Sequence, residues 1–472
     1  METQIEMLGG TEISLSAAQI GTFAGRMEGA TILPRDPAYD EARAVWNGMI
    51  DREPGLIARC ESVSDVQAAV RFAGDHDLLV AVRGGGHNVA GHAVCDGGLV
   101  VDCSRMRSVE VDPDDRVARV GPGATWADVD EATGTHGLAV PGGLVSSTGV
   151  AGLTLGGGFG WLSRAHGLTC DNLLSAEVVT ADGDRVRAGP DENTDLFWAL
   201  RGGGGNFGVV VSFDFRLHPV DDVVAGPVMH DLEDAPEVLR GYRELVDGAP
   251  DELTCYLLFR AAPAAPFLPE EIQGEPALAL VICWCGEPDA GLEATRPLRE
   301  LGDPLADMVE RRPYAEWQTF TDDKWEPGYR DYWKAEYLEG LDGDAISTLV
   351  SHARSLPTPL SDFKVAHFGG AVSRVPDEAT AYPHRDAPFL LNINTRWEDP
   401  ERDDEHTAWT RDVHRAVQPF ATGGTYVNFL GEEGEGRIRA AYGDSYDRLA
   451  AVKRRYDPEN RFRVNQNIEP AP

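Results

Sequence analysis

Glycine is concentrated in three clusters in the first half of the chain, and these clusters constrain the fold more than any other feature of the sequence. They occupy residues 84–86, 156–160 and 202–208. Glycine loses more conformational entropy on folding than other residues, so a dense cluster indicates positive φ angles or a backbone that approaches a ligand closely. Successive N–H groups in such turns form concave sites suited to a diphosphate. One cluster would indicate a packed turn, but three within one half of the chain predict a large phosphate-bearing ligand.

A Rossmann dinucleotide site is the obvious alternative for a phosphate-bearing ligand. Its fingerprint is G-x-G-x-x-G between an early strand and a helix, with an acidic residue about twenty residues later. Residues 156–160 read G-x-G-x-G and residues 202–207 read G-x-G-x-x-F, so neither cluster fits. The sequence therefore disfavours a nicotinamide dinucleotide.

Acidic residues dominate the charge of the chain. Asp and Glu number 78 against 42 Lys and Arg, which gives a formal net charge of -36. Such a field repels phosphate backbones and anionic lipid, so we expect neither nucleic-acid nor membrane partners. Dense salt screens this self-repulsion, and we predict a halophilic host; a high-GC genome, which also prefers arginine codons, is the alternative. The only lysines are Lys324, Lys334, Lys364 and Lys453.

Hydropathy and cysteine usage add three expectations. No run of about eighteen or more apolar residues is present, and the N-terminus lacks a basic stretch followed by an apolar core. We therefore expect a cytoplasmic protein without a membrane span. The seven cysteines are odd in number and lie mostly in or beside apolar runs, which predicts reduced core thiols. Cys283 and Cys285 have the wrong separation for a zinc knuckle, so we expect no metal.

The first half of the chain alternates strand and helix patterns. Ser62 begins a helical repeat of apolar residues, and the sequence around Gly183 is typical of a hairpin turn. The predicted strands are residues 56–60, 78–82, 176–180, 185–187 and 209–217.

Composition changes after Pro219, where a second unit is predicted. Its strand patterns are residues 253–261, 277–284, 364–374 and 389–397, and its helical patterns are residues 235–246, 287–300, 344–354 and 403–416. This order predicts a separate α+β unit with a mostly antiparallel sheet.

Four segments, in order, resemble a known family. Residues 83–88, Arg-Gly-Gly-Gly-His-Asn, resemble the phosphate-binding loop of the vanillyl-alcohol-oxidase-type FAD domain, also called the PCMH-type domain. Residues 149–160 resemble its second loop and residues 198–208 a third element. The tail, residues 442–468, is similar to the C-terminal segment of berberine-bridge-enzyme-like proteins. Together these matches cover most of residues 50–220 and 420–470.

The resemblance implies a fold and a cofactor. The fold is α+β, with a PCMH-type FAD-binding domain at 1–222, a substrate domain at 223–418 and a C-terminal segment at 419–472 that returns to the FAD domain. His87 would bond to the 8α methyl of the flavin, which should raise the flavin potential. The alternative is a histidine that only hydrogen-bonds the loop backbone.

The resemblance also implies single attachment. Many relatives bind FAD a second time through a cysteine, and Val145 stands at that position here, as in the 6-hydroxynicotine-oxidase-like branch. The residues implied to contact FAD are Arg83, Gly84, Gly85, Gly86, His87, Asn88, Gly91, Val145, Thr148, Gly149, Gly152, Gly156, Gly158, Gly160, Val179, Gly205, Asn206, Gly208, Val209, Asn465 and Asn467.

The family reaction moves a hydride from a C–H bond beside a hydroxyl or amine to the flavin, while a basic group takes the heteroatom's proton. Reduced flavin then passes electrons to oxygen or another acceptor. Thr148 stands where relatives often carry a valine or leucine that controls oxygen access, so oxidase and dehydrogenase both stay open. A flavin-binding scaffold without catalysis is the alternative from another class.

The substrate is expected between the flavin and the sheet of the second unit. Strand alternation places Asn392 and Asn394 on one face, where two amides could orient hydroxyls or simply face solvent. Phe429 occupies the position of a tyrosine base in sugar-oxidising relatives, which weakens a carbohydrate-oxidase interpretation. Tyr426 and Asn428 are the remaining candidates by proximity in sequence, and Tyr426 is equally explained as a core strand aromatic.

Overall fold

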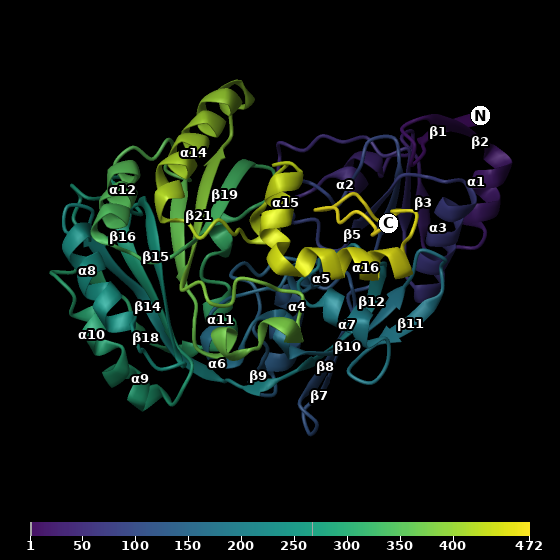
Figure 1. The fold of residues 1–472 in the computed structure, drawn as a ribbon. Coiled ribbons are helices and arrows are strands. Elements are labelled where there is room, and N and C mark those ends of the chain that lie inside the picture. Colours follow the sequence, from purple (N-terminus) through teal and green to yellow (C-terminus); the bar gives the residue numbers. More distant parts are fainter. Residues whose placement is uncertain (1, 267) are drawn as a thin grey trace.

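Two sheets form the first part of the molecule, drawn purple to teal in Figure 1. The computed structural model describes residues 2–266 and 268–472, so Met1, where the predicted FAD-binding domain begins, lies outside the described residues. A four-stranded sheet has the order β3-β4-β6-β5, in which β6 pairs in parallel with β4 and β5. Its strands are β3 (Ala30–Ile32), β4 (Leu56–Arg59), β5 (Val80–Arg83) and β6 (Leu99–Asp102).

The second sheet is antiparallel and has the order β11-β10-β12-β8-β7. Its strands are β7 (Val109–Asp112), β8 (Val117–Val120), β10 (Leu173–Val179), β11 (Arg185–Ala188) and β12 (Val209–Arg216). Helix α3 (Val63–Asp75) contacts both sheets, and its apolar side chains share one core with residues of β4, β6, β10 and β12. The Ser62 side chain caps this helix by accepting a hydrogen bond from the Asp65 backbone N–H at 3.3 Å. The predicted helix and hairpin are confirmed.

One large antiparallel sheet forms the second part, drawn teal to green in Figure 1. Its strand order is β17-β14-β16-β15-β20-β21-β19, and β18 also pairs with β14. The strands are β14 (Asp222–Asp231), β15 (Leu253–Ala261), β16 (Pro276–Trp284), β17 (Ala306–Asp307), β18 (Glu310–Pro313), β19 (Arg330–Leu338), β20 (Asp362–His367) and β21 (Phe389–Trp397). Helices α8 (Ala235–Val246), α12 (Gly343–Ala353) and α14 (Asp403–Val417) cover one face, and the other face turns toward the first part. The predicted α+β fold with a mostly antiparallel sheet is confirmed.

Two predicted elements of this part differ from the structure by more than one residue at an end or in continuity. The strand expected over residues 364–374 ends at His367, because Gly369 and Gly370 adopt φ angles of +93° and +55° and turn the chain into α13 (Ala371–Arg374). The helix expected over residues 287–300 is divided into α9 (Pro288–Ala294) and α10 (Arg296–Arg299). Pro297 lacks a backbone N–H and lies in the first turn of α10, where no such donor is needed.

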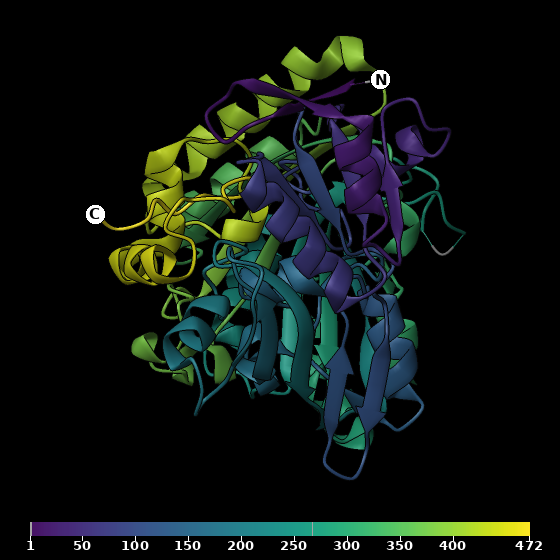
Figure 2. The same cartoon turned by 90° about the vertical axis from the view of Figure 1, so that its right-hand side faces the viewer.

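The C-terminal residues return to the first part of the molecule, as Figures 1 and 2 show in yellow. Helices α15 (Glu435–Tyr442) and α16 (Tyr446–Tyr456) pack their apolar side chains into the core of the five-stranded sheet. Lys453 secures this return: its buried ammonium donates to Asp457 Oδ2 at 2.7 Å and to the carbonyls of Asn206 and Phe462 at 2.8 Å. The C-terminal segment is therefore held against the third glycine cluster by the hydrogen bond from Lys453 to Asn206.

Within residues 2–266 and 268–472, no helix has both the length and the apolar character that a membrane crossing requires. The seven cysteines are free thiols, six of them buried and Cys285 half-buried, as predicted.

Candidate active site

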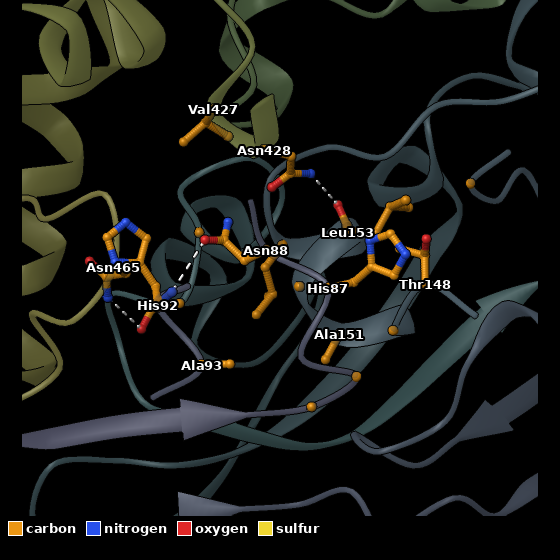
Figure 3. Close-up of a pocket in the computed structure, with 18 of the residues that line it drawn as sticks. His87, Asn88, His92, Ala93, Thr148, Ala151, Leu153, Val427, Asn428 and Asn465 are labelled. Atoms are coloured by element: carbon orange, nitrogen blue, oxygen red, sulfur yellow. Dashed lines mark hydrogen bonds between the residues drawn. The ribbon is translucent and has the colours of Figure 1, made fainter. Parts of the chain in front are cut away.

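The first glycine loop follows β5 and is ordered by hydrogen bonds from its own surroundings. Gly86 has φ +70°, which glycine adopts without strain, and its carbonyl accepts a hydrogen bond from the Trp46 backbone N–H at 3.1 Å. The Asn88 side-chain oxygen accepts from the His92 backbone N–H at 3.3 Å (Figure 3). These contacts hold residues 83–88 along the wall of a cavity.

All three glycine-rich regions border this cavity. An added Cβ on Gly152 or Gly205 would meet no described atom within 4 Å, so protein packing does not explain glycine at either position. Both residues line the cavity, where glycine permits close approach of a ligand to the backbone, and the cradle fits the diphosphate and flavin of FAD. The predicted FAD-contacting residues that line the cavity are Arg83, Gly84, Gly85, Gly86, His87, Asn88, Val145, Thr148, Gly149, Gly152, Gly205, Gly208, Val209 and Asn465.

Three glycines of the second cluster, Gly156, Gly158 and Gly160, do not line the cavity, contrary to prediction. An added Cβ would lie 2.1 Å from Asn428 Oδ1 on Gly156 and 2.0 Å from the Gly142 carbonyl oxygen on Gly160. Gly158 has φ +81°. These three glycines therefore serve turns and close packing between protein segments, and the second loop borders the cavity through residues of its first half and through Phe159.

Asn206 was predicted to contact FAD but lies behind the cavity wall. Its Nδ2 donates to the Gly203 carbonyl at 2.9 Å, and its Oδ1 accepts from the Ile468 backbone N–H at 3.0 Å. Because the side chain is fully buried in these contacts, its role is to join the third glycine loop to the C-terminal segment.

Three other predicted contacts are also outside the lining. Gly91 has φ +72°, and an added Cβ there would lie 2.6 Å from Ile50 Cγ2, so glycine is required by packing. Val179 is buried in the core around α3. Asn467 Nδ2 donates to Glu469 Oε1 at 2.9 Å at the surface.

His87 is an uncharged imidazole on the cavity wall. Its ring stacks on Trp46, with centroids 4.4 Å apart and planes 17° from parallel. Burial, together with a smaller effect of the positive charge of Arg396, lowers its pKa to about 4. Nε2 is buried and has no hydrogen-bond partner among the described residues. Figure 3 shows His87 beside Thr148, with His92 and Asn465 at the opposite side of the cavity.

The indole that supports His87 is held from the second part of the molecule. Trp46 Nε1 donates to the Trp325 carbonyl at 2.8 Å, and the Arg396 guanidinium lies 5.2 Å from the centre of its ring. Arg396 forms a buried ion pair with Asp331 at 2.9 Å. Both parts of the chain therefore determine where the imidazole lies.

Tyr426 and Asn428 come together with the second glycine loop. The Tyr426 hydroxyl oxygen accepts from the Gly158 backbone N–H at 3.0 Å and from Asn428 Nδ2 at 2.8 Å. Asn428 Nδ2 also donates to the Leu153 carbonyl at 3.0 Å (Figure 3). Burial raises the pKa of Tyr426 despite these two donors. Tyr426 precedes a short 3-10 helix (Val427–Phe429), so it is no strand residue, but it is buried in a hydrophobic core, as the alternative expected, and it also lines the cavity.

The large sheet supplies the wall opposite the glycine loops. Asn392 lines the cavity, whereas Asn394, one step further along β21, does not. Every residue of β21 is buried, so neither asparagine faces solvent. Asn394 lies opposite Trp333 on β19 and Asp362 on β20, at the outer end of the same face.

Aromatic side chains and one lysine complete the cavity, and sequence reasoning missed them. These residues come from separate segments of the chain. The scarcity of lysine was the only sequence feature that could have drawn attention to Lys364. Phe429 packs edge-on against Trp333, with ring centroids 5.3 Å apart, so two apolar rings border the cavity side by side. The missed lining residues include Phe159, Tyr256, Trp325, Trp333 and Lys364. In the described part of the chain, no group of three or more His, Cys, Asp or Glu side chains is placed to hold a metal ion.

Two family models match the chain in the regions that form the cavity. A model described as "FAD binding domain" matches residues 54–189. A model described as "Berberine and berberine like" matches residues 425–469.

Whole-length comparisons agree with these matches. The chain is 31% identical to (R)-6-hydroxynicotine oxidase of Paenarthrobacter nicotinovorans over 94% of its own length and 97% of the relative. It is also 31% identical to an uncharacterised FAD-linked oxidoreductase of Bacillus subtilis, over 94% of this chain and 98% of that one.

Solved structures give the same picture. The crystal structure of 6-hydroxy-D-nicotine oxidase from Arthrobacter nicotinovorans superposes with a TM-score of 0.85 at 29% identity, covering 94% of this chain and 98% of that chain. Xylooligosaccharide oxidase from Myceliophthora thermophila, in complex with xylobiose, superposes with a TM-score of 0.84 at 26% identity, covering 97% and 100%.

Proposed function

The chain belongs to the FAD-linked oxidoreductases with a berberine-like C-terminal segment, and from that membership we propose that it oxidises a small alcohol, sugar-like compound or amine with FAD bonded to His87. The observation that carries the proposal is the convergence of three glycine-rich regions and the uncharged imidazole of His87 on a single cavity. The opposite wall of that cavity is a sheet face with polar side chains, which suits a small polar substrate.

Covalent attachment suits the state of His87. A nitrogen must carry a free electron pair to form the bond, and an imidazole with a pKa of about 4 is neutral at pH 7. Stacking on Trp46 restricts the ring to one plane. Val145 lines the cavity and has no thiol, so we propose a single bond to the cofactor.

When bound, FAD supplies the two-electron acceptor for the hydride of the substrate C–H bond and is reoxidised by oxygen or another acceptor. The substrate carbon is thereby oxidised, and the proton of its hydroxyl or amine passes to a basic group or to water. Tyr426 does not supply that base at neutral pH, because its raised pKa keeps the phenol protonated. Since its oxygen accepts two hydrogen bonds from the protein, its own O–H stays available to orient a substrate heteroatom.

The test of this function is anaerobic reduction of the bound flavin. Purified protein is mixed without oxygen with a panel of small alcohols, mono- and disaccharides and cyclic amines, and flavin absorbance is followed. We expect at least one class to bleach the flavin. A flavin that no member of a broad panel reduces would instead identify a binding scaffold.

The electron acceptor is tested with the same reduced protein. Readmitting air and measuring hydrogen peroxide separates an oxidase from a dehydrogenase. Peroxide equal in amount to the substrate consumed supports an oxidase, and reoxidation by a quinone but not by air supports a dehydrogenase.

We also propose that the protein works in a salt-rich cytoplasm. The formal charge of -36 and the low lysine content support this proposal, because a dense acidic surface is self-repulsive unless salt screens it.

A further inference from the structure

Two nitrogen-bearing side chains lie side by side on the sheet wall of the cavity. Lys364 on β20 and Asn392 on β21 are direct partners in the strand register, and both line the cavity. Leu258 and Ala335 stand opposite them on the two flanking strands, so the polar pair is bordered by apolar positions. Adjacent strands therefore present an ammonium and an amide at one spot.

Neither group is fully satisfied by the protein. Asn392 is 3% exposed, and its Nδ2 has no hydrogen-bond partner among the described residues. A buried donor without a partner costs free energy that a bound acceptor would recover. The Lys364 ammonium has Asp362 at 3.4 Å and the ring of Trp325 at 3.9 Å. Burial lowers the pKa of Lys364 although Asp362 raises it, so one carboxylate compensates this charge only in part.

The charge around this spot is opposite in sign to that of the chain as a whole. Asp362 pairs in register with Arg260 of β15, and Lys324 lies close enough to interact with both Arg260 and Lys364. Against these three cations stand Asp362 and the exposed Asp323. Of the four lysines of a chain with net charge -36, Lys364 thus lines the cavity and Lys324 lies close enough to interact with it.

A second ion pair nearby does not alter this balance. Asp331 also interacts with Lys364, but it is bonded to Arg396 at 2.9 Å. With Asp331 set against Arg396, Lys364, Lys324 and Arg260 still outnumber Asp362 and Asp323 at this spot.

A carboxylate is the group that fits this arrangement. Ammonium and amide N–H groups donate to its two oxygens, and a charge-assisted hydrogen bond is stronger than a neutral one. The aromatic wall of Trp325, Trp333 and Tyr256 suits the carbon skeleton that carries the carboxylate.

We propose that Lys364 and Asn392 bind the carboxylate of an anionic substrate, which narrows the substrate to a hydroxy acid, sugar acid or amino acid-like compound. The proposal rests on the cavity being the substrate site of the oxidoreductase described above.

Binding of benzoate and of its uncharged analogue benzamide to the purified protein tests the proposal without turnover. Isothermal titration calorimetry at one fixed salt concentration gives both dissociation constants. We expect benzoate to bind at least about tenfold more tightly than benzamide. Lys364→Met should weaken benzoate by about tenfold or more and leave benzamide nearly unchanged, and Lys364→Arg should retain most of the benzoate affinity.

Two further variants keep the test informative if Lys364→Met does not fold. Asp362→Asn removes the competing carboxylate and should strengthen benzoate binding. Arg415→Met removes one positive charge from the exposed surface of α14 and should have no effect.

Equal affinity for the two probes in the wild type, or equal weakening of both by Lys364→Met, would overturn the proposal. So would a normal benzoate affinity in a Lys364→Met protein whose flavin spectrum has changed, because the lysine would then serve the cofactor. Failure of the oxidoreductase proposal would show differently, as a flavin that no panel substrate reduces while benzoate still binds.

Discussion

Residue scale. The environment of Tyr426 shows how one side chain serves both stability and the site. Its oxygen accepts hydrogen bonds from a glycine-loop N–H and from Asn428, and the residue also lines the cavity. The Gly158 N–H is buried and depends on this acceptor, whereas Asn428 Nδ2 also donates to the Leu153 carbonyl. Tyr426 therefore links the C-terminal segment to the second glycine loop through a hydrogen bond.

Removing that hydroxyl should destabilise the fold. Tyr426→Phe removes the acceptor of the buried Gly158 N–H and one of the two acceptors of Asn428 Nδ2, and we expect the free energy of unfolding to fall by about 1–3 kcal/mol. Urea denaturation followed by circular dichroism measures the change. Tyr332→Phe is the matched control: its hydroxyl accepts from exposed Arg411 at 3.1 Å, and the loss should stay within about 0.5 kcal/mol. Equal stability of the Tyr426→Phe protein and the wild type would contradict the assigned hydrogen bonds.

At this scale, the sequence predicts residues inside contiguous motifs better than residues gathered by folding. The loop from Arg83 to Asn88 lines the cavity as predicted, because its members are neighbours in the chain. Trp46 and Lys364 come from elements whose neighbourhood arises only from tertiary packing. Asn206 lies in a motif but faces away from the cavity, since motif membership does not specify side-chain direction.

Element scale. Comparing two helical glycines distinguishes a glycine that a bound ligand requires from one that the fold alone tolerates. Gly152 lies in α5 (Val150–Leu155) and Gly436 in α15, and an added Cβ on either would meet no described atom within 4 Å. Only Gly152 lines the cavity. A difference between alanine substitutions at these two positions therefore reports on the cofactor.

Gly152→Ala should lower the FAD content of the purified protein without destabilising the apoprotein. Alanine favours a helix by about 1 kcal/mol over glycine, so both Gly152→Ala and Gly436→Ala should be at least as stable as the wild type when flavin is absent. Flavin absorbance per mole of protein, after growth with ample riboflavin, gives the cofactor content. Gly436→Ala should keep full content. Full content in Gly152→Ala would show that the cofactor does not approach this glycine.

Strand prediction succeeded where apolar runs are continuous and failed where they are interrupted. β15 and β16 match the predicted segments closely. β14 was missed because Gly226 and Pro227 interrupt it, and both residues are unfavourable within a strand. β19 was missed because charged residues such as Lys334 and Glu336 alternate along it, and ion pairs in the folded state stabilise them.

Whole-molecule scale. The two parts of the chain are joined at the cavity by specific contacts. Asn47 Nδ2 donates to the carbonyls of Val89 and Asp331 at 2.8 and 2.9 Å, and its Oδ1 accepts from the Asp331 N–H at 3.1 Å. One side chain thereby fixes the first glycine loop to the large sheet. The predicted boundaries at 222 and 418 stay predictions of how the chain is divided.

The net charge of the molecule predicts a strong dependence of stability on salt. Like charges repel across the folded surface, and raising the salt concentration shortens the screening length from about 10 Å at 0.1 M to about 3 Å at 1 M. We expect the melting temperature to rise steeply when potassium chloride is raised over this range. Sucrose at matched osmolarity is the control, because it does not screen charge. A melting temperature that responds equally to both additives would contradict the electrostatic account.

The most direct test of the central claim is to precipitate the purified protein with acid and measure whether the flavin absorbance stays with the pellet or passes to the supernatant. If one cavity holds FAD through a bond to His87, the washed wild-type pellet should stay yellow. Its His87 peptide should carry the mass of FAD after proteolysis. The His87→Ala pellet should be colourless, with any flavin in the supernatant. A colourless wild-type pellet, or a His87→Ala pellet that is still yellow, would contradict the claim.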